Sequence, residues 1–179
     1  MKDIREWVQL VFIVIGGLLA LFAYFQNLRQ RRVENALKFI ALFKDGLKED
    51  DLSHWDSLFR SASELAGCPV GEYRNEDGSC HSIGDYFSEG SGDGYAISRM
   101  AESLDVVCHQ VVTGVADAQT IYYELGQLIN NFHEWLTHIP SGGAGESLMS
   151  TSFPSLGKFI KKYGKKSSKW PSRIFAYIE

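Results

Sequence analysis

Cysteine and proline are scarce in this sequence, with three and four copies among 179 residues. The cysteines are Cys68, Cys80 and Cys108, an odd number with no CxxC pair. Disulfide frameworks of small secreted domains use even sets of cysteines, whereas the cytosol keeps thiols reduced. The cysteine content therefore argues against a disulfide scaffold and favours a reducing compartment.

Charge is missing altogether from the nineteen residues between Trp7 and Phe25, which read WVQLVFIVIGGLLALFAYF. At about 1.5 Å per helical residue, this run is roughly 28 Å long, close to the roughly 30 Å hydrocarbon core of a bilayer. Trp7 and Tyr24 stand near its two ends, where aromatic rings favour the membrane interface. The run predicts a transmembrane anchor over residues 1–28, followed by a domain polar enough to be soluble.

A cleaved signal peptide and a buried soluble helix are the alternatives to a permanent anchor. A signal peptide has a basic leader, an apolar stretch of about 7 to 15 residues and a small-residue cleavage site. Here the stretch is longer, the leader MKDIRE has equal numbers of acidic and basic side chains, and the exit AYFQNLRQRR has no small-x-small site. These features favour the permanent anchor.

The charges that flank the run predict its orientation. Two basic and two acidic residues precede it, whereas Arg29, Arg31 and Arg32 follow it with no acidic residue before Glu34. Flanks on the cytoplasmic side carry the excess of Lys and Arg. The predicted location is the inner (plasma) membrane, with a single pass and the C-terminal domain in the cytoplasm.

The net charge of −4 conceals three blocks of opposite sign: residues 1–33 carry +3, residues 34–157 carry −13 and residues 158–179 carry +6. The basic residues of the last block are interleaved with aromatic and aliphatic ones. They are Lys158, Lys161, Lys162, Lys165, Lys166, Lys169 and Arg173. Each basic residue near an anionic leaflet contributes about 1 kcal/mol of attraction. Three interpretations are open: a terminal helix packed on the acidic middle with solvated lysines, contact with membrane lipid, or an anionic ligand, with nucleic acid the least favoured.

Apolar residues spaced three and four apart predict helices along nearly the whole chain. The expected fold is all-α, with a single N-terminal transmembrane helix followed by a small cytoplasmic helical bundle. The first helix should continue or restart as an amphipathic stalk to about Lys48, and further helices are expected over about 50–65, 95–115 and 119–139. Between the last two, Gly114 allows a short turn and Asp117 can cap the next helix, which makes them antiparallel neighbours.

Glycine and small polar residues mark the loops of the chain. Residues 67–94 hold seven glycines and are expected to form a long loop without strands, in which Tyr86 and Phe87 can pin a short helical turn. This loop belongs to a cytoplasmic helical domain over residues 29–140. Residues 141–179 are expected to form a flexible loop, over 141–153, and a basic C-terminal helix or tail.

The segment HEWLTH is the most tempting sign of catalysis. Zinc proteases use two histidines four residues apart on one helical face, but His133 and His138 are five apart, about 140° around a helix. Glu146 is the only nearby downstream carboxylate for a third ligand. We expect His133 to border the core beside Ile129 and His138 to lie at the last turn, where a cation suits the helix dipole.

The remaining candidate ligands also fit poorly. Cys80 and His81, and likewise Cys108 and His109, are adjacent pairs, and neighbouring side chains on a helix diverge by about 100°. The segment GSGDGY at residues 90–95 lacks the lysine of a phosphate-binding loop and the acid spacing of a calcium loop. We therefore predict no catalytic residue, no metal and no cofactor, with a metal-dependent hydrolase as the third-ranked alternative.

Small residues within the apolar run indicate self-association. Gly16 and Ala20 stand four residues apart, a spacing that lets two transmembrane backbones approach closely. Their stripe also contains Gln9, Ile13 and Ala23, and Gly17 adjoins it. The pattern predicts a parallel homo-oligomer, most simply a dimer; the alternative is a monomer whose glycines face lipid.

Residues 5–140 resemble a family of small bacterial and phage-borne single-pass membrane-anchored helical proteins, classed as a domain of unknown function. The segments that carry the resemblance are QNLRQRRVENALKFI and SRMAESLDVVCHQVVTGVADAQTIYYELGQLINNFHEWL. Its marks are Glu102, the turn at Gly114 and Asp117, Tyr122 or Tyr123, and Trp135. In that family a basic helix usually follows the aromatic one directly, whereas here SGGAGESLMS intervenes. The resemblance implies a membrane protein without established chemistry, in the setting of stress or anti-phage responses.

Two functions are consistent with these features. The first is a membrane-tethered non-enzymatic interaction or signalling module whose helical bundle binds a protein or a small anionic ligand. The second is a membrane-perturbing effector whose oligomerising spans permeabilise the bilayer.

Overall fold

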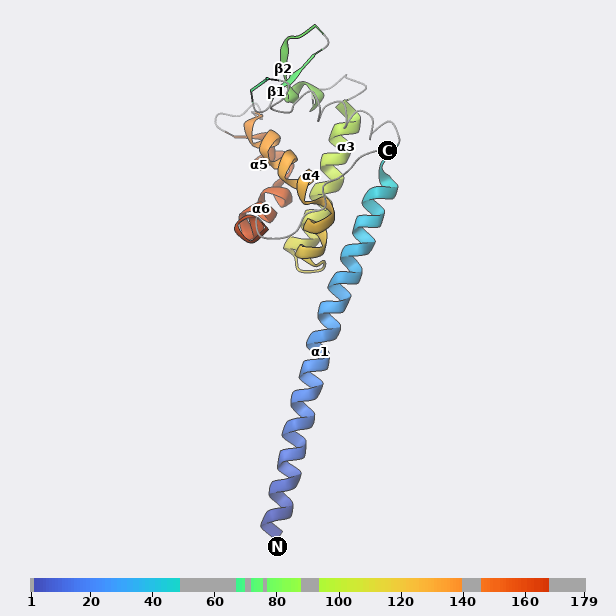
Figure 1. Cartoon of the computed structure of the whole chain (residues 1–179), viewed down its shortest axis with the longest axis vertical. Helices are drawn as coiled ribbons and strands as arrows, with labels where there is room; N and C mark the ends of the chain where they lie inside the picture. Colours follow the sequence, from blue (N-terminus) through green and yellow to red (C-terminus); the bar gives the residue numbers. More distant parts are fainter. Residues whose placement is uncertain are drawn as a thin grey trace.

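The structure is a computed structural model that describes residues 2–48, 67–69, 72–75, 77–87, 94–139 and 146–167. In chain order its elements are α1 (Lys2–Gly46), β1 (Glu72–Arg74), β2 (Cys80–Ser82), the 3-10 helix η2 (Ile83–Phe87), α3 (Gly94–Val112), α4 (Ala118–His138), α5 (Leu148–Ser152) and α6 (Pro154–Ser167). Figure 1 shows α1 as a long rod with the other elements gathered around its C-terminal half. We call this gathered part, α1 from Arg29 onward and the later elements, the body.

The helix α1 is uninterrupted over 45 residues and has two different halves. Every described side chain from residue 5 to residue 25 is exposed. Further on, Ala36, Ile40 and Phe43 are at most 5% exposed and lie in the core of the body. Their spacing of four and three confirms the predicted amphipathic stalk, which ends at Gly46 rather than Lys48. Because the helix does not break, the apolar half and the stalk form one continuous element.

Among the described residues, α1 is the helix that is long and apolar enough to cross a membrane. Its most apolar 18-residue window has a mean hydropathy of 2.4, and none of that window is buried. A core helix of a soluble domain is mostly buried, which argues against that alternative. A signal sequence near the N-terminus would pass the same test of length and hydropathy.

The helices α3 and α4 run antiparallel, as predicted from their short connection (Figure 1). Gly114 has a φ of +80°, in the left-handed region that favours glycine, and allows the chain to turn. Asp117 then caps α4, because its side chain accepts a hydrogen bond of 2.8 Å from the amide of Thr120. The sequence pattern located both the turn and the cap.

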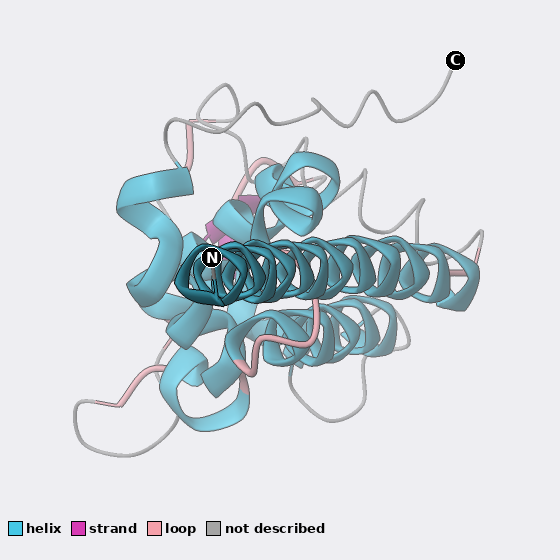
Figure 2. Cartoon of the chain, turned by 90° about the horizontal axis from the view of Figure 1, so that it is seen from below, coloured by secondary structure: helices cyan, strands magenta, loops and turns pink. Residues whose placement is uncertain are grey.

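The helix α6 packs on α3 and α4 and completes the core. Its side chains Leu156 and Phe159 are fully buried, and the ring of Phe159 stacks on that of Tyr122 with 6.5 Å between centroids. The basic helix expected near the C-terminus is present as α6. The flexible loop expected over 141–153 is partly wrong. Residues 148–152 form α5, and buried Met149 holds that short helix against the core. Figure 2 shows the helices of the body packed around the C-terminal half of α1.

The all-α prediction and the strandless loop over 67–94 need correction. The strands β1 and β2 pair as an antiparallel hairpin, with Tyr73 opposite His81. Each strand is three residues long, too short for an alternating pattern to reveal it. The expected short helical turn is present as η2, where fully buried Ile83 joins the hairpin to the core.

The expectation of unpaired thiols is wrong for two of the three cysteines. Cys68 and Cys80 form a disulfide that joins the segment before the hairpin to β2, with 5.9 Å between their Cα atoms. Cys108 is the remaining free thiol, and it is fully buried in α3. The odd count arises because one cysteine packs as a small apolar side chain in the core.

Some expectations lie outside the described residues. These are the helix over about 50–65, most of the GSGDGY segment, and the end of the basic tail with Lys169 and Arg173.

Candidate functional site

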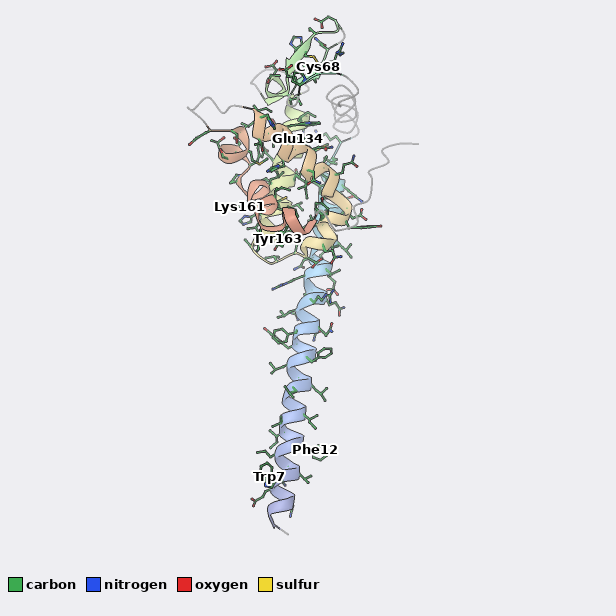
Figure 3. All side chains as sticks on the ribbon, turned by 60° about the vertical axis from the view of Figure 1, so that its left-hand side comes forward. Trp7, Phe12, Cys68, Glu134, Lys161 and Tyr163 are labelled. Carbon is green, nitrogen blue, oxygen red and sulfur yellow. A yellow bond between two sulfur atoms is a disulfide. The ribbon has the colours of Figure 1, made fainter. Side chains whose placement is uncertain are left out.

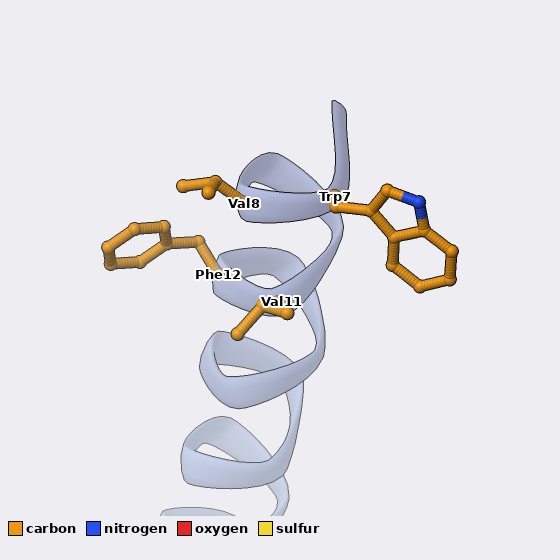
Figure 4. A pocket seen from close by; sticks show the side chains of 4 residues that line it. All are labelled: Trp7, Val8, Val11 and Phe12. Atoms are coloured by element: carbon orange, nitrogen blue, oxygen red, sulfur yellow. The ribbon is translucent and has the colours of Figure 1, made fainter. Parts of the chain in front are cut away.

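The first candidate functional surface is the apolar half of α1. Large side chains project from all round this helix; for example, Trp7 is 68% exposed, Phe12 is 72% exposed and Phe22 is 63% exposed. Figure 3 shows Trp7 and Phe12 on the part of α1 that lies far from the body. Figure 4 shows Val8 and Phe12 on one side of the helix and Trp7 on the other; with Val11 they line a hollow whose walls are apolar side chains of this one helix. Such a surface is large, continuous and apolar, which marks an interaction with lipid or with another apolar helix.

The two glycines of this half have open space beside them among the described residues. A Cβ atom added to Gly16 or to Gly17 would meet nothing within 4 Å. The stripe predicted to mediate self-association, which includes Ala20, is therefore open to lipid or to a second copy.

The three arginines after the apolar run lie where the body begins. Arg29 is four residues, about 6 Å of helix, beyond Phe25. Arg29, Arg31 and Arg32 are all exposed, and within the described part of the chain none of them forms an ion pair. Further along α1, Lys44 forms an ion pair with Glu124 at 3.0 Å. The arginines are thus available for groups outside the chain.

The turn between α3 and α4 is attached to α1 immediately after these arginines. The amide of Asp117 donates to the carbonyl of Arg32 at 3.0 Å. One turn further along, the side-chain amide of Asn35 donates to the carbonyl of Val115 at 3.1 Å. Because the turn between α3 and α4 is bonded to the helix itself, this end of the body has a fixed height along α1.

A hollow of about 290 Å³ lies between α1 and the first turns of α4. We call it the junction pocket. Its lining residues are Arg29, Val33, Asp117, Gln119, Thr120 and Tyr123. Tyr123 is 44% exposed and nearby Val115 is 41% exposed, so the same end of the body presents an aromatic and an aliphatic side chain.

The basic residues of α6 lie on the outside of the body. Lys158, Lys161 and Lys162 are exposed, while Leu156 and Phe159 anchor the helix in the core. The ammonium of Lys162 donates to the carbonyl of Val112 at 3.2 Å and lies 5.2 Å from the ring centroid of Tyr163. In Figure 3, Lys161 and Tyr163 lie nearer to the apolar half of α1 than Glu134 and Cys68 do. This part of the tail is a packed terminal helix with a solvated basic face.

Within the described residues, the segment HEWLTH is not part of a side-chain group placed to hold a metal. It lies within α4, where the ring nitrogen Nδ1 of His138 is 2.7 Å from the carbonyl oxygen of Glu134. His138 therefore lies at the last turn, as expected. The described residues contain no group of three or more His, Cys, Asp or Glu side chains placed to hold a metal.

His133 borders the core, also as expected. It is half-buried, and this burial lowers its pKa below the ordinary value, while the negative charge of Glu134 acts in the opposite direction. The neutral imidazole is the favoured form because burial disfavours its charged form.

The cysteine and histidine pairs do not assemble either. The disulfide takes up Cys68 and Cys80, and burial raises the pKa of the Cys108 thiol well above its usual range. A thiol that resists ionisation is a poor nucleophile and a poor ligand.

Sequence analysis missed a cluster in the hairpin turn. The hydroxyl of Ser79 hydrogen bonds to Asp77 and lies 2.7 Å from Nε2 of His81. The bonds to Ser79 lower the pKa of Asp77. In a catalytic triad the carboxylate orients the histidine, whereas here it bonds to the serine. The arrangement is therefore a turn motif, and the letters NEDGS are its sequence signal.

A second missed feature joins α3 to α6. The carboxylate of Asp105 accepts a hydrogen bond of 2.7 Å from the amide of Leu156, and His109 lies 3.4 Å from the hydroxyl of Ser155. Asp105 thus caps the first turn of α6 from a neighbouring helix. Both contacts join α3 to the start of α6, which indicates a structural role for the cluster.

No protein-family model matches the chain, and neither a curated protein nor a solved structure matches it. The resemblance to membrane-anchored helical proteins of bacteria and phages stays a prediction.

Proposed function

We propose that the chain is a membrane-tethered, non-enzymatic interaction or signalling module. The observation that carries this proposal is the single helix α1, which has a fully exposed apolar half and continues without a break into the core of the body. An exposed apolar surface of this size is stable only in lipid or against other apolar helices. A permanent anchor accounts for the absence of a signal-type cleavage site and for the arginines that follow.

We propose that the body faces the cytoplasm. The exposed arginines at residues 29, 31 and 32 support this side, because flanking Lys and Arg decide how a span inserts. The disulfide between Cys68 and Cys80 favours an oxidising compartment instead. We give the arginines more weight for two reasons. Cys80 is exposed, and a single exposed disulfide is readily reduced. Flanking arginines, in contrast, determine the orientation of the helix when it inserts into the membrane.

Reporter fusions test the orientation. A fluorescent protein or an alkaline phosphatase is placed after the full chain, and each fusion is expressed in bacterial cells. The proposal expects fluorescence and no phosphatase activity, because phosphatase folds only after export. Phosphatase activity without fluorescence would place the body outside and would agree with the disulfide.

The proposed ligand of the body is a partner protein or a small anionic molecule. The basic face of α6 supports it, because Lys158 and Lys161 are exposed on a helix that the core holds rigidly. Anchoring at a surface raises the local concentration of partners, so that even a weak site can be occupied.

Crosslinking tests the proposed partner. The full chain is purified from crosslinked native membranes, and bound proteins are identified by mass spectrometry. We expect a partner that is lost in the double variant Lys158→Gln, Lys161→Gln. The matched control is Lys38→Gln, which removes an exposed charge from α1. A partner retained by the double variant would exclude the basic face as the binding site.

The second candidate function is a membrane-perturbing effector. The open surface at Gly16 and Gly17 favours it, because close helix packing of several copies is one route to a pore. A dye-leak assay on expressing cells separates the two functions. Leakage by the full chain that persists after deletion of residues 34–179 supports the effector, whereas no leakage supports the interaction module.

A further inference from the structure

The junction pocket is the strongest feature that the proposed function does not use. It is a hollow with a mixed polar and apolar lining between two helices, at the end of the body nearest to the apolar half of α1. Its size, about 290 Å³, is at the small end of the range for ligand pockets. It suits a compact polar group rather than a whole lipid or a large cofactor.

The height of the pocket along α1 follows from the helix geometry. Arg29 stands about 6 Å beyond the end of the apolar run, and Asp117 is bonded to Arg32, about 10 Å beyond it. The interfacial regions of a bilayer add about 5 to 8 Å on each side of the hydrocarbon core. If α1 spans the membrane, as the proposed function requires, Arg29 lies within the headgroup layer and the pocket opens at the outer edge of that layer.

The lining offers one group of each charge. Arg29 is exposed and forms no ion pair with a described residue, and a guanidinium binds phosphate oxygens in a planar, two-pronged geometry. Asp117 uses a single carboxylate oxygen, Oδ2, for both of its bonds to Thr120, each 2.8 Å long. Its other oxygen retains the capacity to accept a hydrogen bond.

The apolar part of the lining also suits a position at the membrane interface. Tyr123 and Val33 complete the pocket, and Tyr123 is partly exposed. An aromatic ring with a hydroxyl group is favoured at the boundary between headgroups and acyl chains.

We propose that the junction pocket binds the headgroup of a zwitterionic phospholipid with a primary ammonium, of the phosphatidylethanolamine type. Arg29 binds the phosphate, and Asp117 accepts a hydrogen bond from the ammonium. A purely anionic headgroup would leave Asp117 without a cation and close to a second negative charge. A choline headgroup has no N–H to donate to the carboxylate.

The test uses the full chain in nanodiscs made from equal parts of phosphatidylethanolamine, phosphatidylcholine and phosphatidylglycerol. After transfer to mild detergent, the lipids that stay with the protein are counted by mass spectrometry. We expect enrichment of the ethanolamine lipid. Arg29→Gln should lower its retention about tenfold, because a charge-assisted contact is lost. Asp117→Asn keeps a helix cap but should remove the preference for ethanolamine over choline.

Arg31→Gln is the matched control, since it removes the same charge from the same segment but does not line the pocket. If Arg29→Gln and Arg31→Gln lose the same amount of retained lipid, the arginines attract lipid through their charge in general, and the site is overturned. Equal retention of ethanolamine and choline lipids would also overturn it. Binding of soluble phosphoethanolamine without retention of lipid would identify a site for a free small molecule.

The same experiment separates this inference from the proposed function. A chain that enters nanodiscs but shows no headgroup preference contradicts the pocket alone. A chain that stays out of nanodiscs contradicts the anchor, and the pocket with it.

Discussion

His133 couples the stability of the body to pH. Burial lowers its pKa, so the unfolded chain binds a proton more readily than the folded chain does. The free energy of unfolding should therefore fall as the pH drops below about 6.5, the ordinary pKa of histidine, and this effect should vanish at higher pH. Thermal unfolding of wild type and His133→Gln, at pH 8 and at pH 5.5, measures it.

We expect the midpoint of wild type to drop further between these two pH values than that of His133→Gln. The measurement at pH 8 separates any loss of packing from the proton effect. If the two proteins lose the same stability on acidification, the neutral, half-buried imidazole is not the cause.

Cys108 should be inert while the body is folded. Its thiol is fully buried, and burial, followed by the nearby Asp105, raises its pKa. In the double variant Cys68→Ser, Cys80→Ser it is the only thiol, so that a maleimide reports on it alone. We expect labelling only at the rate at which the protein unfolds, and full labelling in denaturant. Rapid labelling of the folded protein would contradict its placement in the core.

Residues differ in how far the sequence reveals their roles. The cap at Asp117 was predictable because its partner Thr120 is three residues away. The cap from Asp105 to Leu156 was not, because it joins positions 51 residues apart and only the packing of α3 on α6 creates it. The disulfide was hidden for a similar reason, since the cysteine count alone does not reveal which thiol the core buries.

At the scale of elements, the attachment of α6 depends on that long-range cap. Asp105→Ala would leave the amide of Leu156 without its acceptor in the first turn of the helix. We expect a loss of about 1 to 3 kcal/mol, enough to loosen α6 while the rest of the body stays folded. Hydrogen exchange or tryptic cleavage at Lys158 and Lys161 measures the loosening.

Two variants control this experiment. Asp105→Asn keeps an oxygen acceptor and should lose less protection than the alanine variant. Glu102→Ala removes an exposed acidic residue one turn earlier and should behave as wild type. If α6 is as well protected from exchange and cleavage in Asp105→Ala as in wild type, the cap does not hold the helix.

Periodicity predicted the long elements and failed for the short ones. The helices α3 and α4 matched their expected positions to within a few residues, α1 ended two residues before the expected Lys48, and α6 begins where the basic C-terminal helix or tail was expected. The strands of the hairpin and the helix α5 span three to five residues, and tertiary contacts, including the disulfide and the burial of Met149, hold them. Patterns in such short segments cannot reveal these contacts in advance.

At the scale of the molecule, one helix belongs to two environments. Its first half exposes apolar side chains on every face, and its second half is part of the core. The body is bonded to α1 directly after the arginines, and its disulfide hairpin lies at the end away from the apolar half (Figure 1). Polar and charged groups near the junction and an apolar rod beyond it are the arrangement expected of a membrane-anchored protein.

The central claim is that α1 remains in the chain and spans a membrane. Membranes from expressing cells are washed with alkaline carbonate and centrifuged, and the intact mass of the protein is measured in both fractions. The account predicts the full 20.1 kDa chain in the pellet. A full-length chain in the supernatant, or a shorter chain that lacks the apolar run, would contradict it.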